Sequence, residues 1–283
     1  MNSAGIWILT AIVVYMLIVL AVGFFYARRN ESVGDFYLGG KRLGPIVTAM
    51  SAEASDMSSW LLMGLPGVAY LSGLAEAGWT MTGLAIGTYV NWLVVARRLR
   101  RYSQTAVNVI TLPEFFSNRY RDSRKLLTWV SAAVILIFFI PYTAAGFVSC
   151  GKLFNSVFGM DYTSAMLFGA LVIVAYTAVG GFLAASTTDL IQGIIMSIAL
   201  ISILIFGAAI AGGLGAVLEN TRALPGYLSM TLSHDAVSKT ASDYGPISII
   251  SAMAWGLGYF GMPHILLRFM AASDEKKLKL SRR

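Results

Sequence analysis

Long apolar segments alternate with short polar stretches along the chain, and this pattern predicts helices that cross a membrane. One span needs about 20 mainly apolar residues, and seven segments approach or exceed that length. The expected spans cover residues 6–26, 46–71, 79–95, 126–146, 164–179, 190–211 and 247–270. Between the third and fourth, Thr111-Leu112-Pro113-Glu114 resembles a capping box and predicts a short surface helix at 112–120. Pro141 is expected to interrupt the fourth span.

The second span is the least lipid-like of the seven. Its residues 51–67 include two carboxylates, four serines and a Gly-Leu-Pro-Gly run. Ionisable groups are costly inside a bilayer, so their presence indicates function. Gly and Pro favour a helix that unwinds partway and frees backbone carbonyls. The alternative is an ordinary polar helix–helix interface.

The seventh span repeats this interruption with Gly256, Gly258, Gly261 and Pro263. Paired broken helices in corresponding positions are typical of inverted-repeat transporters. If the second to sixth spans form one five-helix repeat, the seventh span is the first helix of a second repeat.

Composition supports the membrane assignment. The chain is 57% hydrophobic and 12% charged, whereas soluble domains carry roughly 25% charged residues. Cys150 is the only cysteine, which excludes an intrachain disulfide and a cysteine metal cluster. The first apolar segment lacks a basic n-region and a small-residue cleavage motif, so we expect a retained span.

The charges predict the orientation. Eighteen of the 21 lysines and arginines flank one side of the expected spans, and Lys152, Arg222 and Lys239 lie on the other. The positive-inside rule then places the N-terminus outside and the tail after the seventh span inside. The net charge of +7 therefore indicates topology and contact with lipid headgroups rather than nucleic-acid binding.

Asp56 is the sharpest candidate for chemistry. A carboxylate with serine hydroxyls and freed carbonyls offers hard oxygen ligands, which suit Na⁺. Asp56 could equally carry a proton or cap the broken helix. Glu53 lies three residues earlier on the same expected helical face. The pair either shares a proton or cation, or Glu53 faces a different cavity and is solvated.

Trp255 and Tyr259 share one helical face and predict an aromatic pocket for a compact, partly apolar solute. Small-residue packing is the alternative.

His264 lacks a partner cluster and is interpreted as structural or solvated. Asp189 follows Gly180-Gly181 and either caps the sixth span or lies near an inner ion path. The chain contains no HExxH, P-loop or GxSxG motif, so an enzyme is not expected.

Four motifs resemble the sodium/solute symporter family, and in particular its bacterial proline carriers. They are Ser55–Gly67, Leu38–Pro45, Gly180–Gln192 and Trp255–Arg268, in the same order and spacing. The resemblance covers essentially the whole chain and implies an all-α, LeuT-type inverted-repeat fold. In one domain, 1–283, residues 6–26 would be an extra helix. Residues 46–211 would form the first repeat, and 247–270 would open the second.

The resemblance implies that Na⁺ and L-proline enter together across the bacterial cytoplasmic membrane by alternating access. Na⁺ would be the coupling ion, with no cofactor. The implied sodium-binding residues are Ala54, Asp56, Met57, Ser58 and Asp189. The implied proline pocket comprises Trp60, Tyr142, Trp255, Tyr259 and Pro263. Lys41, Glu53 and Gly64 are expected to serve coupling or gating.

Three positions depart from the family pattern. Lys41 replaces an arginine, while Glu53 and Ser59 replace glycines of the proline carriers. A related amino acid or a betaine-like solute is therefore an alternative substrate. Family members also continue for several more spans, so we expect an N-terminal portion that alone gives no sodium-coupled uptake. A symporter-like sensor or binding domain is the other alternative, and a membrane enzyme is disfavoured.

Overall fold

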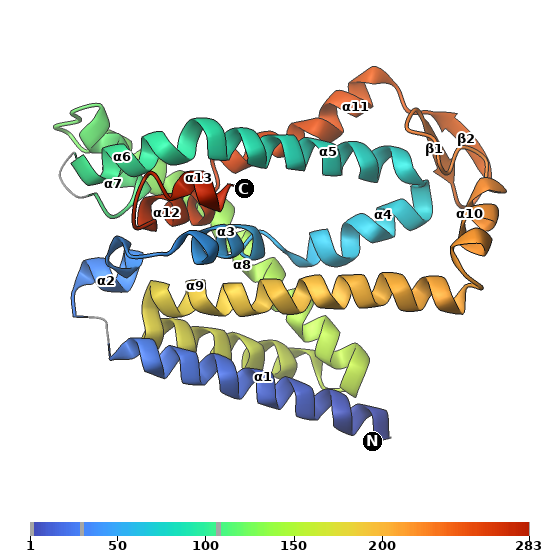
Figure 1. The fold of residues 1–283 in the computed structure, drawn as a ribbon, viewed down its shortest axis with the longest axis horizontal. Helices are drawn as coiled ribbons and strands as arrows, with labels where there is room; N and C mark the ends of the chain where they lie inside the picture. The colour runs from blue at the N-terminus through green and yellow to red at the C-terminus, as the bar shows by residue number, and fades with distance from the viewer. Residues whose placement is uncertain (1–2, 29–30, 106–108, 283) are drawn as a thin grey trace.

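The computed structural model describes residues 3–28, 31–105 and 109–282, and it shows a helical bundle with one small hairpin (Figure 1). Arg29 and Arg283, two of the charges used to predict orientation, lie outside the described residues. The helices in chain order are α1 Ser3–Ala27, α2 Val33–Leu38, α3 Pro45–Ala54, α4 Leu65–Ser72, α5 Leu74–Asn91, α6 Arg97–Thr105, α7 Leu112–Arg119, α8 Leu126–Phe158, α9 Tyr162–Ile210, α10 Leu214–Arg222, α11 Pro246–Met253, α12 Pro263–Ala271 and α13 Leu278–Ser281. Tighter or wider helical turns are η1 Gly39–Lys41, η2 Trp60–Gly64, η3 Trp92–Ala96 and η4 Ala254–Phe260, and the strands are β1 Leu232–Asp235 and β2 Thr240–Asp243.

Three described helices, α1, α8 and α9, are each long and apolar enough to cross a membrane. A fourth candidate is the pair formed by α11–η4 and α12, which bends by 44°. The expected second span is divided into α3, η2 and α4, and the third is α5 continued by η3. The predicted surface helix at 112–120 is confirmed as α7, where the Thr111 hydroxyl accepts from the Glu114 amide.

The expected fifth and sixth spans both lie within α9. The chain changes direction at Gly181, whose φ of 65° and ψ of −159° are not helical. Such a φ favours glycine because it has no Cβ. Figure 1 shows the two arms of α9 meeting at the left, with α1 packed alongside. The two spans are therefore joined without a polar loop.

Two other sequence predictions are wrong. Pro141 does not interrupt the fourth span, since α8 runs from Leu126 to Phe158 with this proline inside it. The expected second and third spans left residues 72–78 between helices, but α5 begins at Leu74 and has Glu76 in its first turn. Gly73, at φ 79°, makes the whole turn between α4 and α5. The hydrophobic pattern located the helices but misjudged how little chain is needed to connect them.

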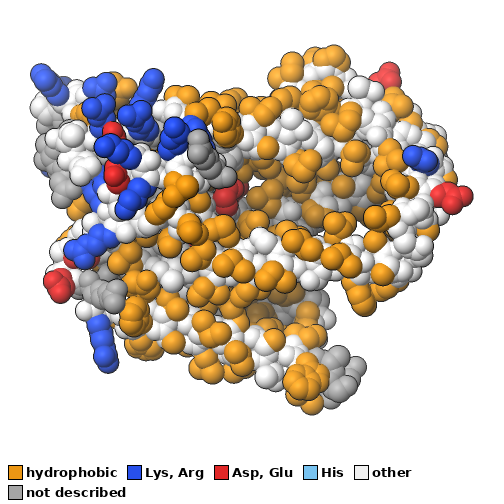
Figure 2. Space-filling model, viewed as in Figure 1, with side chains coloured by type: hydrophobic (Ala, Val, Ile, Leu, Met, Phe, Trp, Pro, Cys, Tyr) orange, Lys and Arg blue, Asp and Glu red, His pale blue; other side chains and the backbone are white. Residues whose placement is uncertain are grey.

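The hydrophobic core lies at one end of the molecule, where α12 packs against α3, α6, α7 and η3. Leu43 and Ala272 pair there as an isolated parallel bridge, with amide–carbonyl distances of 3.1 and 2.9 Å on either side. Lysine and arginine side chains gather over this end (Figure 2). We call it the basic end. At the opposite end, β1 and β2 form an antiparallel hairpin beside α10.

Candidate functional site

The interruption predicted in the second span is confirmed. α3 ends at Ala54 and η2 begins at Trp60. Between them the Met57 amide donates to the Ala54 carbonyl at 3.2 Å, and the Ser58 amide donates to the Asp56 carbonyl at 2.7 Å. These contacts are turns rather than helix, so the regular helical hydrogen-bond pattern is interrupted here. Carbonyl, hydroxyl and carboxylate oxygens are concentrated in this short stretch.

Asp56 is buried in the break, with 8% of its surface exposed. The Tyr259 hydroxyl donates to its Oδ2 at 2.5 Å. Asn91 Nδ2 in turn donates to the Tyr259 carbonyl at 2.9 Å. No helix-capping hydrogen bond from the Asp56 side chain is present in the described residues. The carboxylate therefore links the first broken helix to the second instead of capping its own helix.

Glu53 does not share a helical face with Asp56, because α3 ends between them at Ala54. Its exposed side chain lines a cavity of about 530 Å³ that also includes Thr88, Tyr259 and Arg282. Asp56 is not part of that lining. The geometry fits the interpretation in which Glu53 faces a separate, solvated cavity.

Asp189 lies eight residues beyond Gly181 inside the second arm of α9, so the capping interpretation is wrong. Its Oδ2 accepts hydrogen bonds from the Arg268 guanidinium at 2.7 Å and from the Ser51 hydroxyl at 2.6 Å. Arg268 Nε also donates to Ser51 Oγ at 2.6 Å. We call Ser51, Asp189 and Arg268 the polar triangle. It joins α3, α9 and α12 in a nearly buried site.

The predicted aromatic residues fall into separate groups. Trp60 and Trp255 stack with ring centroids 4.3 Å apart and planes 8° from parallel. Tyr142 and Pro263 line a different cavity of about 390 Å³, while Tyr259 is turned toward Asp56. Tyr259 lines the cavity of Glu53, and neither that cavity nor the one of Tyr142 and Pro263 includes Trp60 or Trp255.

His264 lies in the cavity of Tyr142 and Pro263. Its ring is nearly parallel to that of Tyr142 at 5.8 Å and edge-on to Phe139 at 5.5 Å. Both ring nitrogens are buried and have no hydrogen-bond partner among the described residues. Sequence reasoning interpreted this histidine as structural or solvated, and its buried ring fits the structural interpretation. Its neighbours in space come from α8, more than a hundred residues earlier. Arg268 was passed over because it was counted only as an inner-side charge.

The remaining predicted residues hold the surroundings in place. Lys41, in a left-handed conformation with φ 57°, donates from Nζ to the Ser103 carbonyl of α6 at 2.7 Å. Burial, followed by repulsion from Arg100, lowers the pKa of Lys41. At Gly64 a Cβ would approach the Trp60 ring within 2.9 Å. A side chain there would displace the stacked tryptophan.

The polar groups of the first break are oxygen atoms, the ligand type that hard cations prefer. The described residues contain no group of three His, Cys, Asp or Glu side chains that could hold a metal ion. The break does offer a buried carboxylate, serine hydroxyls and loosened carbonyls. Such oxygen ligands suit hard cations.

Comparison with known proteins gives one family. The profile of the Sodium:solute symporter family matches residues 36–283. The chain is 48% identical over 277 residues to a sodium/proline symporter of Haemophilus influenzae, covering 95% of this chain and 52% of the relative. It is 47% identical over 264 residues to the high-affinity proline transporter PutP of Bacillus subtilis, covering 93% and 54%.

Among solved structures, a sodium-coupled sialic acid symporter in a substrate-bound outward-open state matches with a TM-score of 0.76. The sequences are 18% identical, and the match covers 95% of this chain and 54% of the other. The expected mostly helical membrane fold is thereby confirmed. The chain spans about half the length of the curated relatives it matches.

Proposed function

The chain belongs to the sodium:solute symporter family, and from this premise we propose that it forms part of a carrier for sodium-coupled uptake of L-proline by alternating access. The observation that carries the proposal is the contact between Tyr259 and Asp56. It joins the two broken helices at a carboxylate placed among loosened carbonyls. The names of the relatives support proline as the solute.

Sodium would bind in the first break. The carbonyls of Ala54 and Met57, the Ser58 hydroxyl and the Asp56 carboxylate supply its oxygen ligands. Asp189 would lie along the inner ion path, where Arg268 now neutralises it. A cation arriving at Asp56 would compete with the Tyr259 hydroxyl for the same carboxylate. Ion binding would thus weaken the hydrogen bond that joins the second broken helix to Asp56.

The solute would bind next to this break, among Trp60, Trp255, Tyr142, Tyr259 and Pro263. The stacked pair of Trp60 and Trp255 supplies flat apolar faces of the kind that pack against a small ring. The same pair favours one alternative, a betaine-like solute, because indole faces attract quaternary ammonium groups. Lys41, Glu53 and Gly64 would tune coupling through the contacts described above.

The repeat division and the orientation complete the proposal. Residues 46–211 would be one repeat and 247–270 the opening helix of the next, with 6–26 outside both. The basic end would face the cytoplasm, in agreement with the positive-inside rule. The polar triangle and the Leu43–Ala272 bridge would then close the inner side.

The test joins residues 1–283 to the remainder of the Haemophilus influenzae relative, in a host without proline carriers. We expect uptake of labelled proline that depends on Na⁺. Added betaine should inhibit this uptake only weakly. Asp56→Asn should reduce it about tenfold or more, the scale of one charged contact. Glu76→Gln, an exposed change at the start of α5, is the matched control. Uptake that ignores Na⁺, or that survives Asp56→Asn, would contradict the proposal.

A second measurement uses the 283-residue chain itself. Proline added to the purified chain should change tryptophan fluorescence through Trp60 and Trp255, and Na⁺ should raise the apparent affinity. Binding of proline with the same affinity with and without Na⁺ would favour the sensor or binding-domain alternative.

A further inference from the structure

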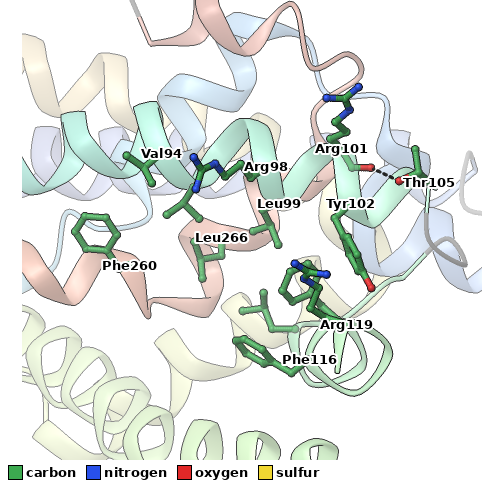
Figure 3. Close-up of a pocket in the computed structure, with 13 residues that line it drawn as sticks. Val94, Arg98, Leu99, Arg101, Tyr102, Thr105, Phe116, Arg119, Phe260 and Leu266 are labelled. Carbon is green, nitrogen blue, oxygen red and sulfur yellow. Dashed lines mark hydrogen bonds between the residues drawn. The ribbon is translucent and has the colours of Figure 1, made fainter. Parts of the chain in front are cut away.

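A cavity of about 620 Å³ opens at the basic end, between η3–α6, α7 and α12 (Figure 3). Its walls are apolar and include Val94, Phe116, Phe260 and Leu266. Arg98, Arg101 and Arg119 also line it, and all three side chains are exposed. The cavity therefore combines an apolar interior with a cationic mouth.

The three arginines are only weakly neutralised by the protein. Arg98 has no ion-pair partner among the described residues. Arg101 Nε lies 3.9 Å from Glu275, and the Arg101 side chain is 71% exposed, so this pair contributes little. The Arg119 guanidinium lies over the Tyr102 ring at 5.3 Å and forms no ion pair with a described residue. A guanidinium is well suited to a phosphate because its donors match two oxygens at once.

The surface beside the cavity changes from apolar to basic within a few residues. Leu93 and Val94 are 45% and 43% exposed, and Arg97 and Arg98 follow within the next four residues. That sequence of surfaces is expected where a spanning helix leaves the hydrocarbon and meets the headgroups. Free phosphate would not need the apolar walls, and an uncharged apolar chain would not need the arginines.

We propose that this cavity binds one anionic phospholipid. The phosphate would be held by Arg98 and Arg119, since the Arg101 side chain points away from both (Figure 3), and an acyl chain would lie against Val94, Phe116 and Phe260. The lipid would brace α7 against α6 and α12 at the basic end. This inference depends on the chain being a membrane protein, and does not depend on sodium or proline as its cargo.

The first experiment uses the unaltered 283-residue chain in maltoside micelles. Phenylglyoxal labelling followed by peptide mass spectrometry measures how fast each arginine reacts. Phosphatidylglycerol should protect Arg98 and Arg119 at least about fivefold, whereas phosphatidylcholine should not. Arg124, exposed and outside the cavity, is the internal control and should react equally with both lipids. Equal protection in both lipids would overturn the proposal, because the arginines would then not select an anionic headgroup.

The second experiment compares two variants of equal charge. Arg98→Gln/Arg119→Gln should weaken binding of phosphatidylglycerol, titrated by native mass spectrometry, about fivefold for each arginine. Arg97→Gln/Arg124→Gln should leave it within about twofold. Inorganic phosphate at the same concentration should neither bind measurably nor compete. If phosphate competes as well as the lipid, the site is a simple anion site and the lipid assignment is wrong.

Discussion

The two interrupted helices of the molecule are broken in different ways. In the first, α3 and α4 are separated by an unwound polar stretch and the wide turn η2. In the second, α11 and α12 are separated by the tight helical turn η4 and a 44° bend. In each broken helix the half at the basic end, α3 or α12, contains several buried residues. The other half is exposed, since α4 has no buried residue and α11 has only Ala252.

The second break carries Trp255 and Tyr259, and it also packs closely against α5. Gly256 lies so close to α5 that a Cβ on it would come within 2.0 Å of the Gly83 carbonyl oxygen. Conversely, a Cβ on Gly87 would come within 2.2 Å of the Gly256 carbonyl. The first break holds the carboxylate and the hydroxyls. The glycine contacts of the second break therefore anchor that helix to α5. The first break leaves its polar groups able to rearrange.

The largest expected effect comes from removing the anchor of α12. Arg268→Met would leave Asp189 and Ser51 buried without their cation, which should lower the free energy of unfolding by about 3–5 kcal/mol. Chemical unfolding in detergent, followed by near-UV circular dichroism, measures the change. Arg42→Met, whose partner Asp35 is 3.9 Å away, is the control. If both variants unfold alike, the polar triangle does not hold α12.

Next in size is a change to the glycine contact. Gly256→Ala should destabilise the chain by about 3 kcal/mol, because the added methyl meets backbone that cannot move aside. Gly258→Ala, whose Cβ would meet only the flexible end of Met262 at 3.9 Å, should cost far less. Melting temperatures of the two variants provide the comparison. Equal melting temperatures would show that the helices α5 and η4 separate easily.

A smaller effect is expected at the link between the two breaks. Tyr259→Phe removes the donor to Asp56 and should cost about 1.5–3 kcal/mol, the range for hydrogen bonds to charged groups. Tyr244→Phe, whose hydroxyl makes only a 3.4 Å exposed contact, should be nearly silent. Urea unfolding of both variants tests this. A silent Tyr259→Phe would mean that the breaks are not coupled through Asp56.

The smallest effect is a pH dependence at Lys41. Burial, and then Arg100, lower its pKa in the folded state, so the unfolded chain binds the proton more tightly. Stability should therefore rise with pH between the lowered pKa and the ordinary value near 10.5. Lys41→Met should flatten that rise when melting is followed from pH 8 to 11. A stability that falls with pH in the wild-type chain, and not in the variant, would contradict the assignment.

Much of the fold follows from local pattern. Apolar length predicted α1 and α8, and the Thr111–Glu114 motif predicted α7, because both signals depend on neighbouring residues. The expected fifth and sixth spans left residues 180–189 between helices, yet α9 resumes at once after Gly181. Gly180, Ala184, Ser186 and Thr188 are buried there. The small and polar residues that resemble a loop are in fact a packed helix surface.

The candidate site was predictable in its chemistry but not in its pairing. The run around Asp56 stands out because it breaks the apolar pattern. Its contact with Tyr259 joins residues 203 positions apart, which no local periodicity can reveal. The same holds for Arg268 with Ser51, 217 positions apart. Partners of this kind depend on how the broken helices cross.

The pairing of Leu43 with Ala272 has a consequence for biosynthesis. Its first strand emerges early, and its second only after nearly the whole described chain has been made. At about 5–20 residues per second, Leu43 waits on the order of tens of seconds for its partner. During that interval the N–H and C=O groups of Leu43 need water, lipid headgroups or a chaperone as temporary partners. Assembly of the basic end is thus timed by the synthesis of α12 and of Ala272, which directly follows it.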